Sequence, residues 1–212
     1  GEYFPKIGVG ILKKPDDRPY DFFREYECIP EECIVSVKAD CVTFAIDSRP
    51  CRGYAYTYHK EVSVDENRLT ISCTLKNTGE KPIETNEYCH NFLGIDGMAV
   101  GKGYTLRLPQ GLSASVLKGE LYYKDGVITW PDALMQEQFY CMIEPPAAQQ
   151  PYSWALTHTQ SGAGVRETDD FTPCRVALWG FRHVISPEAF VGISLACGEI
   201  QTWTREYEFS SQ

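Results

Sequence analysis

The stretch Leu69-Thr70-Ile71-Ser72-Cys73-Thr74-Leu75 decides the fold, because an apolar residue occupies every second position. A period of two puts the apolar side chains on one face and the hydroxyl groups on the other. This pattern is typical of a half-buried antiparallel strand. The same alternation recurs at residues 34–39, 41–46, 54–64, 104–108, 175–185, 190–195 and 200–209. The chain is therefore expected to consist largely of strands.

Turn signals separate these runs, as in Lys124-Asp125-Gly126 between two apolar segments. No segment keeps the 3.6-residue period of an amphipathic helix for three turns. Many short strands divided by turns predict an all-β fold, either an antiparallel β-sandwich or a barrel. We find no linker or repeat and expect one domain over residues 1–212, with two large sheets facing each other.

Composition excludes several classes of partner. The 212 residues carry a net charge of −9, whereas nucleic acid or an anionic membrane surface would require a basic face. No apolar run approaches the roughly 20 residues of a membrane-spanning helix. Aromatic residues reach 13%, which suits a β core and also suits stacking on sugar rings. The β core is the stronger interpretation of the two.

Nine cysteines cannot all pair within one chain, and no two of them form a C-x-x-C motif. We expect reduced thiols that act as small apolar side chains, and hence a cytoplasmic protein. Neither a P-loop nor a G-x-G-x-x-G motif is present, and no group of residues has metal-ligand spacing. We therefore expect no cofactor and no metal.

His90 is the first candidate for chemistry. In an extended chain, Tyr88, His90 and Phe92 share one face, and Cys89 and Asn91 the other. The first face is too polar for a core and too aromatic for a plain solvent face, so it resembles the wall of a pocket. A histidine that only serves the structure remains the alternative.

Glu188 is the first candidate for a base. Alternation groups Trp179, Phe181 and His183 on one face, and Ser186-Pro187-Glu188 is expected to turn the chain beside them. A carboxylate at a strand end, next to aromatic rings, suits a general base. Glu167, in an acidic loop, is a second candidate. A turn residue, a surface ion pair or a solvated loop are the alternatives.

These residues carry a resemblance to a known superfamily. The stretch 67–92, which contains Asn86-Glu87-Tyr88-Cys89-His90-Asn91-Phe92, resembles the central part of the galactose mutarotase (aldose 1-epimerase)-like superfamily, including its segment with the catalytic histidine. The closing stretch 186–199 and the last strand resemble the end of the family pattern. Residues 4–10 lie where the family often has a sugar-contact segment.

The resemblance implies a supersandwich of two large antiparallel sheets that binds a small-molecule sugar. It also implies a reaction in which a base takes the anomeric hydroxyl proton while an acid protonates the ring oxygen. His90 would be the acid, with Glu188 or Glu167 as the base. The implied sugar-binding residues are Lys6, Tyr88, Trp179, His183 and Arg205.

Two departures from the family pattern shape the alternatives. The family's earlier active-site histidine has no clear match, and no carboxylate stands near Leu178-Trp179, where the family has its catalytic glutamate. The chain also begins after the first strands typical of the family, as a fragment or a shorter relative would. Exposed sheet edges would then favour a homodimer.

We therefore expect an enzyme that interconverts sugar anomers. A non-catalytic carbohydrate-binding protein on the same fold is the alternative. A structural β-sandwich that mediates protein contacts is the third hypothesis.

Overall fold

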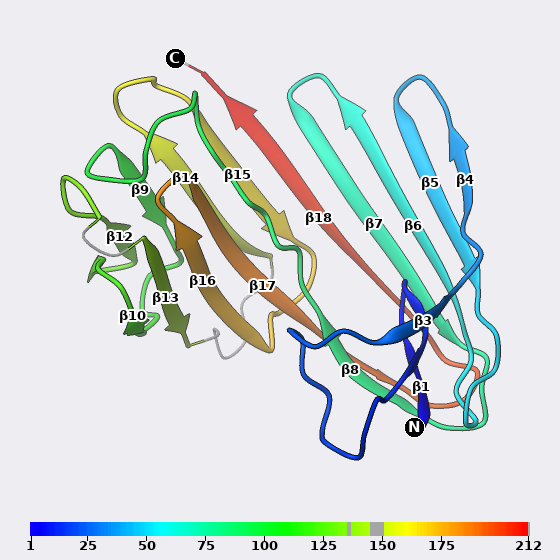
Figure 1. Cartoon of the computed structure of the whole chain (residues 1–212). Helices are drawn as coiled ribbons and strands as arrows, with labels where there is room; N and C mark the ends of the chain where they lie inside the picture. Colours follow the sequence, from blue (N-terminus) through cyan, green and yellow to red (C-terminus); the bar gives the residue numbers. More distant parts are fainter. Residues whose placement is uncertain (135–136, 145–150, 212) are drawn as a thin grey trace. The chain divides into compact units, whose positions relative to one another are not determined.

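The computed structural model describes residues 1–134, 137–144 and 151–211 (Figure 1). These residues form β-strands and connecting segments, and no helix occurs among them. The described residues therefore contain no helix that could span a membrane. The all-β, antiparallel prediction is confirmed.

The chain forms two compact units. Unit 1 comprises Gly1–Ser63, Ile71–Thr85 and Ile193–Thr202, and unit 2 comprises Val64–Thr70, Asn86–Gly192 and Trp203–Gln212. Several strands contribute residues to both units. A single domain over residues 1–212 stays a prediction.

Unit 1 contains a small antiparallel sheet of three strands and part of a larger sheet. The small sheet has the order β1 (Tyr3–Lys6), β2 (Gly10–Lys13) and β3 (Glu27–Pro30). Its part of the larger, ten-stranded sheet has β4 (Ile34–Val37), β5 (Cys41–Asp47), β6 (Tyr56–Asp65) and β7 (Arg68–Asn77) in this order. In β7 the predicted alternation is confirmed, because Cys73 and Leu75 are buried.

Unit 2 is a sandwich of two antiparallel sheets (Figure 1). The first has the order β11 (Tyr122–Lys124), β12 (Val127–Thr129), β9 (Tyr104–Arg107), β14 (Tyr152–His158), β15 (Gly164–Asp169) and β18 (Ile200–Ser210). The second has the order β10 (Ala114–Lys118), β13 (Gln138–Ile143), β16 (Arg175–Phe181), β17 (Val184–Leu195) and β8 (Ile83–Glu87).

The core of unit 2 lies between these two sheets. Every second residue of β14 and β13 is buried there, such as Trp154 and Leu156 on one sheet and Phe139 and Cys141 on the other. Arg205 of β18 also crosses the core, since its Nη2 donates a hydrogen bond of 3.0 Å to the Ala189 carbonyl of β17. The sandwich prediction is therefore confirmed.

The hairpin of β16 and β17 corrects one expectation. The chain turns at Arg182 and His183, and Ser186-Pro187-Glu188 continues as part of β17. Leu93 exchanges two backbone hydrogen bonds with Ile185, on the side of β17 away from β16. Because alternate residues face the same way, the nitrogen of Pro187 faces this side as well. The chain there, at residues 88–92, is irregular, so the missing N–H of proline breaks no regular ladder.

Gly180 of β16 provides a test of the packing. A Cβ atom at this position would overlap the ring of Phe139, which is fully buried. We expect Gly180→Ala to lower the free energy of unfolding by about 1–3 kcal/mol, because an overpacked core must distort.

Gly192→Ala on β17 is the matched control, since the nearest atom there, Cys174 Cβ, lies at 3.5 Å. It should change the stability by less than about 0.5 kcal/mol. Urea denaturation measures both variants. Equal effects of the two substitutions would contradict the described packing of β16 on β13.

Candidate functional site

The candidate site begins where β8 ends at Glu87. The next five residues leave the regular sheet, and Phe92 adopts a left-handed conformation with φ of 47°. The predicted alternation of sides nevertheless persists. Tyr88, His90 and Phe92 form ring contacts on one side of this segment, whereas Asn91 contacts the interior of unit 2 on the other.

The register of the β16–β17 hairpin builds the floor of the site. Trp179 pairs with Ser186, and two residues along, Ala177 pairs with Glu188. Partners in an antiparallel pair share a face, as do residues two apart in a strand. Since Ala177 carries only a methyl group, no bulky side chain stands opposite Glu188.

Aromatic rings surround this floor. The His90 imidazole stacks on the Phe92 ring, with centroids 4.0 Å apart and planes within 9°. Its edge meets Trp179 at 5.1 Å, and Tyr88 stacks on Phe190 at 4.3 Å. Such contacts favour defined ring positions. Phe92 remains 54% exposed, so the cluster presents an aromatic surface to solvent.

Polar atoms converge at the centre of the cluster. His90 Nδ1 lies 2.9 Å from Ser186 Oγ and 3.4 Å from Glu188 Oε1. Ser186 Oγ donates a 3.1 Å hydrogen bond to Glu188 Oε1 and accepts one of 2.9 Å from the backbone N–H of Asn91. The Glu188 side chain is 6% exposed and that of His90 33%. Because Nδ1 is engaged, Nε2 is the imidazole nitrogen left for a ligand.

Burial brings both ionisable groups toward their neutral forms. It raises the pKa of Glu188 to about 7, although the Ser186 hydrogen bond and the Arg175 charge oppose the rise. Burial also lowers the pKa of His90 below its usual value. A carboxyl group of raised pKa beside an imidazole of lowered pKa can exchange protons with a substrate.

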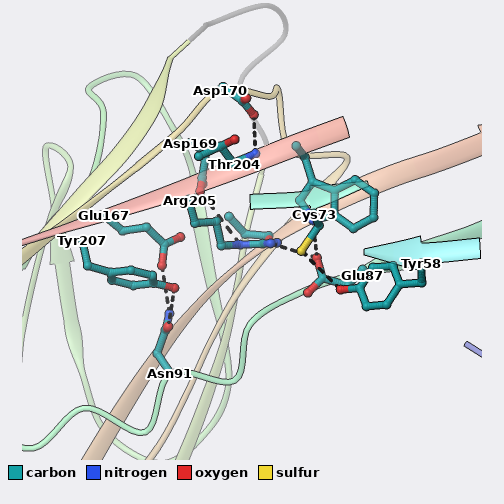
Figure 2. Close-up of polar contacts among 12 residues, drawn as sticks. Tyr58, Cys73, Glu87, Asn91, Glu167, Asp169, Asp170, Thr204, Arg205 and Tyr207 are labelled. Atoms are coloured by element: carbon teal, nitrogen blue, oxygen red, sulfur yellow. Dashed lines mark hydrogen bonds and ion pairs between the residues drawn. The ribbon is translucent and has the colours of Figure 1, made fainter. Parts of the chain in front are cut away.

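A second polar network, drawn in Figure 2, lies in the core and contacts Glu87 and Asn91. Asn91 Nδ2 donates to Glu167 Oε2 at 3.2 Å, and the Tyr207 hydroxyl donates to Asn91 Oδ1 at 2.8 Å. Arg205 Nη1 forms an ion pair of 2.8 Å with Glu87 Oε2. These contacts hold the segment that carries His90 in place on its core-facing side.

The structure brings together four of the predicted site residues: His90, Glu188, Tyr88 and Trp179. It places Glu167 and Arg205 in the core, where they are 0% and 2% exposed and contact Asn91 and Glu87.

The two other predicted residues have different contacts. His183 stands at the exposed β16–β17 turn against Phe181, at 5.2 Å between ring centroids. Lys6 belongs to unit 1, where its Nζ lies 2.6 Å from the Tyr20 hydroxyl.

Sequence reasoning missed Ser186. The sequence pattern predicted that Ser186 belongs to a turn, and nothing in that pattern shows that its hydroxyl lies between His90 and Glu188. The contact exists only because the hairpin register and the irregular 88–92 segment meet.

No family model matches the chain, and no curated protein matches its sequence. Solved structures do match. One is an Escherichia coli K12 protein predicted to be an aldose 1-epimerase, with a TM-score of 0.63 and 10% identity over 100% of this chain and 80% of that one. A GalM/aldose epimerase homologue from C. elegans gives a TM-score of 0.62 and 14% identity over 84% and 68%. Galactose 1-epimerase from Lactobacillus acidophilus NCFM gives 0.54 and 13% over 86% and 67%.

This chain therefore has the fold of the galactose mutarotase-like proteins, as the resemblance in its sequence implied. At identities of 7–14% the similarity concerns the fold alone.

Asp169 offers a test of the core network. Burial and the neighbouring Glu167 together raise its pKa to about 9, against the charge of Arg205. The folded state thus keeps a proton that the unfolded state releases near pH 4. Stability that depends on this proton is present at low pH and is lost as the pH rises toward about 9.

We expect Asp169→Asn to reduce this loss, because an amide cannot ionise. Urea denaturation of the variant at pH 6, 7.5 and 9 should give a flatter profile than the wild type. Asp170→Asn is the control, since the exposed Asp170 accepts a hydrogen bond from the Thr204 N–H and an amide oxygen can do the same. Parallel profiles of the wild type and Asp169→Asn would contradict a protonated Asp169.

Proposed function

We propose that this protein is an aldose 1-epimerase that interconverts the anomers of a sugar at the His90–Glu188 site. The observation that carries the proposal is the approach of His90 Nδ1 to Glu188 Oε1, at 3.4 Å, within a cluster of aromatic rings. The fold shared with aldose epimerases supports it.

The aromatic rings supply the binding surface. A pyranose presents C–H groups on its faces, and these pack on the exposed ring of Phe92 and the half-buried ring of Trp179. A sugar seated there would have its anomeric end beside His90 Nε2 and the Glu188 carboxyl. The small Ala177 leaves room at that position.

The two groups supply what ring opening requires. One removes the proton of the anomeric hydroxyl, and the other protonates the ring oxygen while the bond between C1 and that oxygen breaks. Rotation about C1–C2 and the reverse proton transfers close the other anomer. Glu188 now stands as the partner of His90 in this proposal, and Glu167 as a residue that supports Asn91.

Carbohydrate binding without catalysis is the second candidate. The stacked rings of Phe92, Trp179 and Tyr88 would hold a sugar whether or not the ionisable groups react. For the location of the protein we propose the cytoplasm. None of the nine cysteines, all of which lie within the described residues, forms a disulfide, and reduced thiols suit a reducing compartment.

His90→Gln tests the function. We expect this variant to lose at least about 100-fold of the anomer exchange rate, because glutamine does not titrate. Exchange NMR on the α and β anomeric protons of glucose, galactose and their charged derivatives measures the rate. His59→Gln, on an exposed position of β6 in unit 1, should keep the wild-type rate.

Wild-type exchange by His90→Gln would contradict the proposed site. Saturable sugar binding by the wild-type protein, without any acceleration of exchange, would instead support the carbohydrate-binding candidate. A thermal melt of each variant separates loss of activity from loss of the fold.

A further inference from the structure

We propose that the Ser186 hydroxyl relays a proton between His90 and Glu188, so that the three side chains act as one bifunctional catalyst. This inference rests on the proposed epimerase function. It goes beyond that function by linking the acid and the base into a single path.

The hydrogen bonds around Ser186 carry the argument. Its Oγ lies 2.9 Å from His90 Nδ1 and 3.1 Å from Glu188 Oε1. One lone pair of Oγ is already occupied by the Asn91 N–H at 2.9 Å. The remaining lone pair and the hydroxyl proton are therefore shared between the imidazole and the carboxyl group, one toward each.

The proton balance closes without any change in charge. At the start, Nδ1–H donates to Oγ, the hydroxyl donates to Oε1, and Glu188 is protonated on Oε2. His90 Nε2 takes the proton of the anomeric hydroxyl, Nδ1–H passes to Oγ, the Oγ proton passes to Oε1, and the Oε2 proton passes to the ring oxygen. In this direction His90 is the base and Glu188 the acid, the reverse of the roles that the family resemblance implied. The C1–ring oxygen bond breaks as the carbonyl forms at C1.

The reverse transfers close the ring on the other face of that carbonyl. In both states Ser186 donates one hydrogen bond and accepts two, so neither state leaves the buried hydroxyl unsatisfied. The relay needs a neutral imidazole and a protonated carboxyl group. Burial favours both forms, since it lowers the pKa of His90 and raises that of Glu188 to about 7.

The pH profile of the wild type reports the two protonation states that the relay needs. Activity through the relay falls when the pH drops below the lowered pKa of His90, because the imidazole then gains a proton. It falls again when the pH rises above about 7, because Glu188 then loses its proton. The wild-type rate should therefore be highest between the lowered pKa of His90 and about 7.

Ser186→Ala tests the relay. We expect kcat to fall about 100-fold with little change in KM, and the pH optimum of the residual activity to shift. Ser186→Thr keeps the hydroxyl and should recover part of kcat. Ser194→Ala, which removes another β17 hydroxyl that bonds Glu84, should behave as the wild type.

The possible failures can be told apart. A wild-type protein that accelerates exchange of no sugar overturns the proposed function. A wild type that is active, together with a Ser186→Ala variant of unchanged kcat, or of reduced kcat with an unchanged pH profile, overturns the relay alone. Melting curves show whether Ser186→Ala and Ser186→Thr fold, and the threonine variant keeps the test open if alanine does not.

A different observation points to the substrate class. We infer that Arg175 binds an oxyanion substituent of the sugar, either a carboxylate or a phosphate. This second inference also rests on the proposed function, and it concerns binding rather than proton transfer.

Arg175 lies on the same face as the catalytic pair. It pairs with Phe190 in the register, two residues along β16 from Ala177, which pairs with Glu188. Two residues of a strand span about 6.7 Å, within reach of one sugar ring and its exocyclic group. The positive charge of Arg175 opposes the rise in the pKa of Glu188, as expected for a cation on the same face.

The protein holds this cation in place without neutralising it. The guanidinium carbon lies 4.7 Å from the centroid of the Phe190 ring, and Nη2 donates a 2.8 Å hydrogen bond to the Tyr140 hydroxyl. Its other polar contact among the described residues is the Met142 sulfur, at 3.8 Å. An oriented guanidinium whose described polar contacts are all uncharged favours carboxylate or phosphate.

Arg175→Gln tests the subsite on three sugars: glucose, glucuronate and glucose 6-phosphate. The wild type should show a lower KM for at least one anionic sugar than for glucose. The variant should raise that KM about tenfold, as expected for the loss of one charge-assisted contact, and leave the KM for glucose unchanged. Arg166→Gln, an exposed residue of β15, removes the same charge and should have no effect.

The two anionic sugars separate a carboxylate site from a phosphate site. Equal KM values for the neutral and anionic sugars, or an equal rise for all three in Arg175→Gln, overturn the subsite while leaving the epimerase proposal intact. An inactive wild type on all three sugars overturns the epimerase proposal instead.

Discussion

The candidate site depends on the way Asn91 is held. Its side chain donates hydrogen bonds to Glu167 and to the Pro187 carbonyl and accepts one from Tyr207, while its backbone N–H donates to Ser186. Four contacts on one residue fix a segment that has left the regular sheet. With Asn91 turned toward the core, the alternation of the chain directs His90 to the other side.

This arrangement explains how an irregular segment can position a catalytic group. A regular strand at residues 88–92 would require a backbone N–H donor at position 187 on that side, and proline has none. The Asn91 side chain takes the place of this ladder by bonding the Pro187 carbonyl at 2.6 Å. The break in the sheet and the position of His90 thus follow from the same pair of residues.

The sequence predicted the strands well because their alternation depends on local contrasts between polar and apolar residues. The faces of Tyr88, His90 and Phe92 could be predicted in the same way. The sequence did not predict the hairpin turn at Arg182 and His183, because the apolar pattern continues past these two positions and neither of them is a glycine or a proline.

The sequence pattern also could not predict the roles of Glu167 and Arg205. A buried carboxylate and an exposed one look alike in a sequence, and only the packing of β15 and β18 on the second sheet shows that both residues lie in the core. The positions of Ser186 and Arg175 in the site depend on the register between β16 and β17. Pairing between the two strands sets this register, and the local sequence does not reveal it.

Burial shifts pKa values in both polar networks, but the charged groups of the core network are not among the causes of the pKa shifts of His90 and Glu188. Arg205 pairs with Glu87, and the raised pKa of Asp169 keeps that carboxyl group neutral, so the core network holds little net negative charge. Burial raises the pKa of Glu188 against the Ser186 hydrogen bond and the Arg175 charge, and burial lowers the pKa of His90. Asn91 forms hydrogen bonds with residues of both networks, and these bonds fix the position of the His90 segment. The core can therefore hold the catalytic segment rigidly while the proton affinity of the site is set by the residues on its own face.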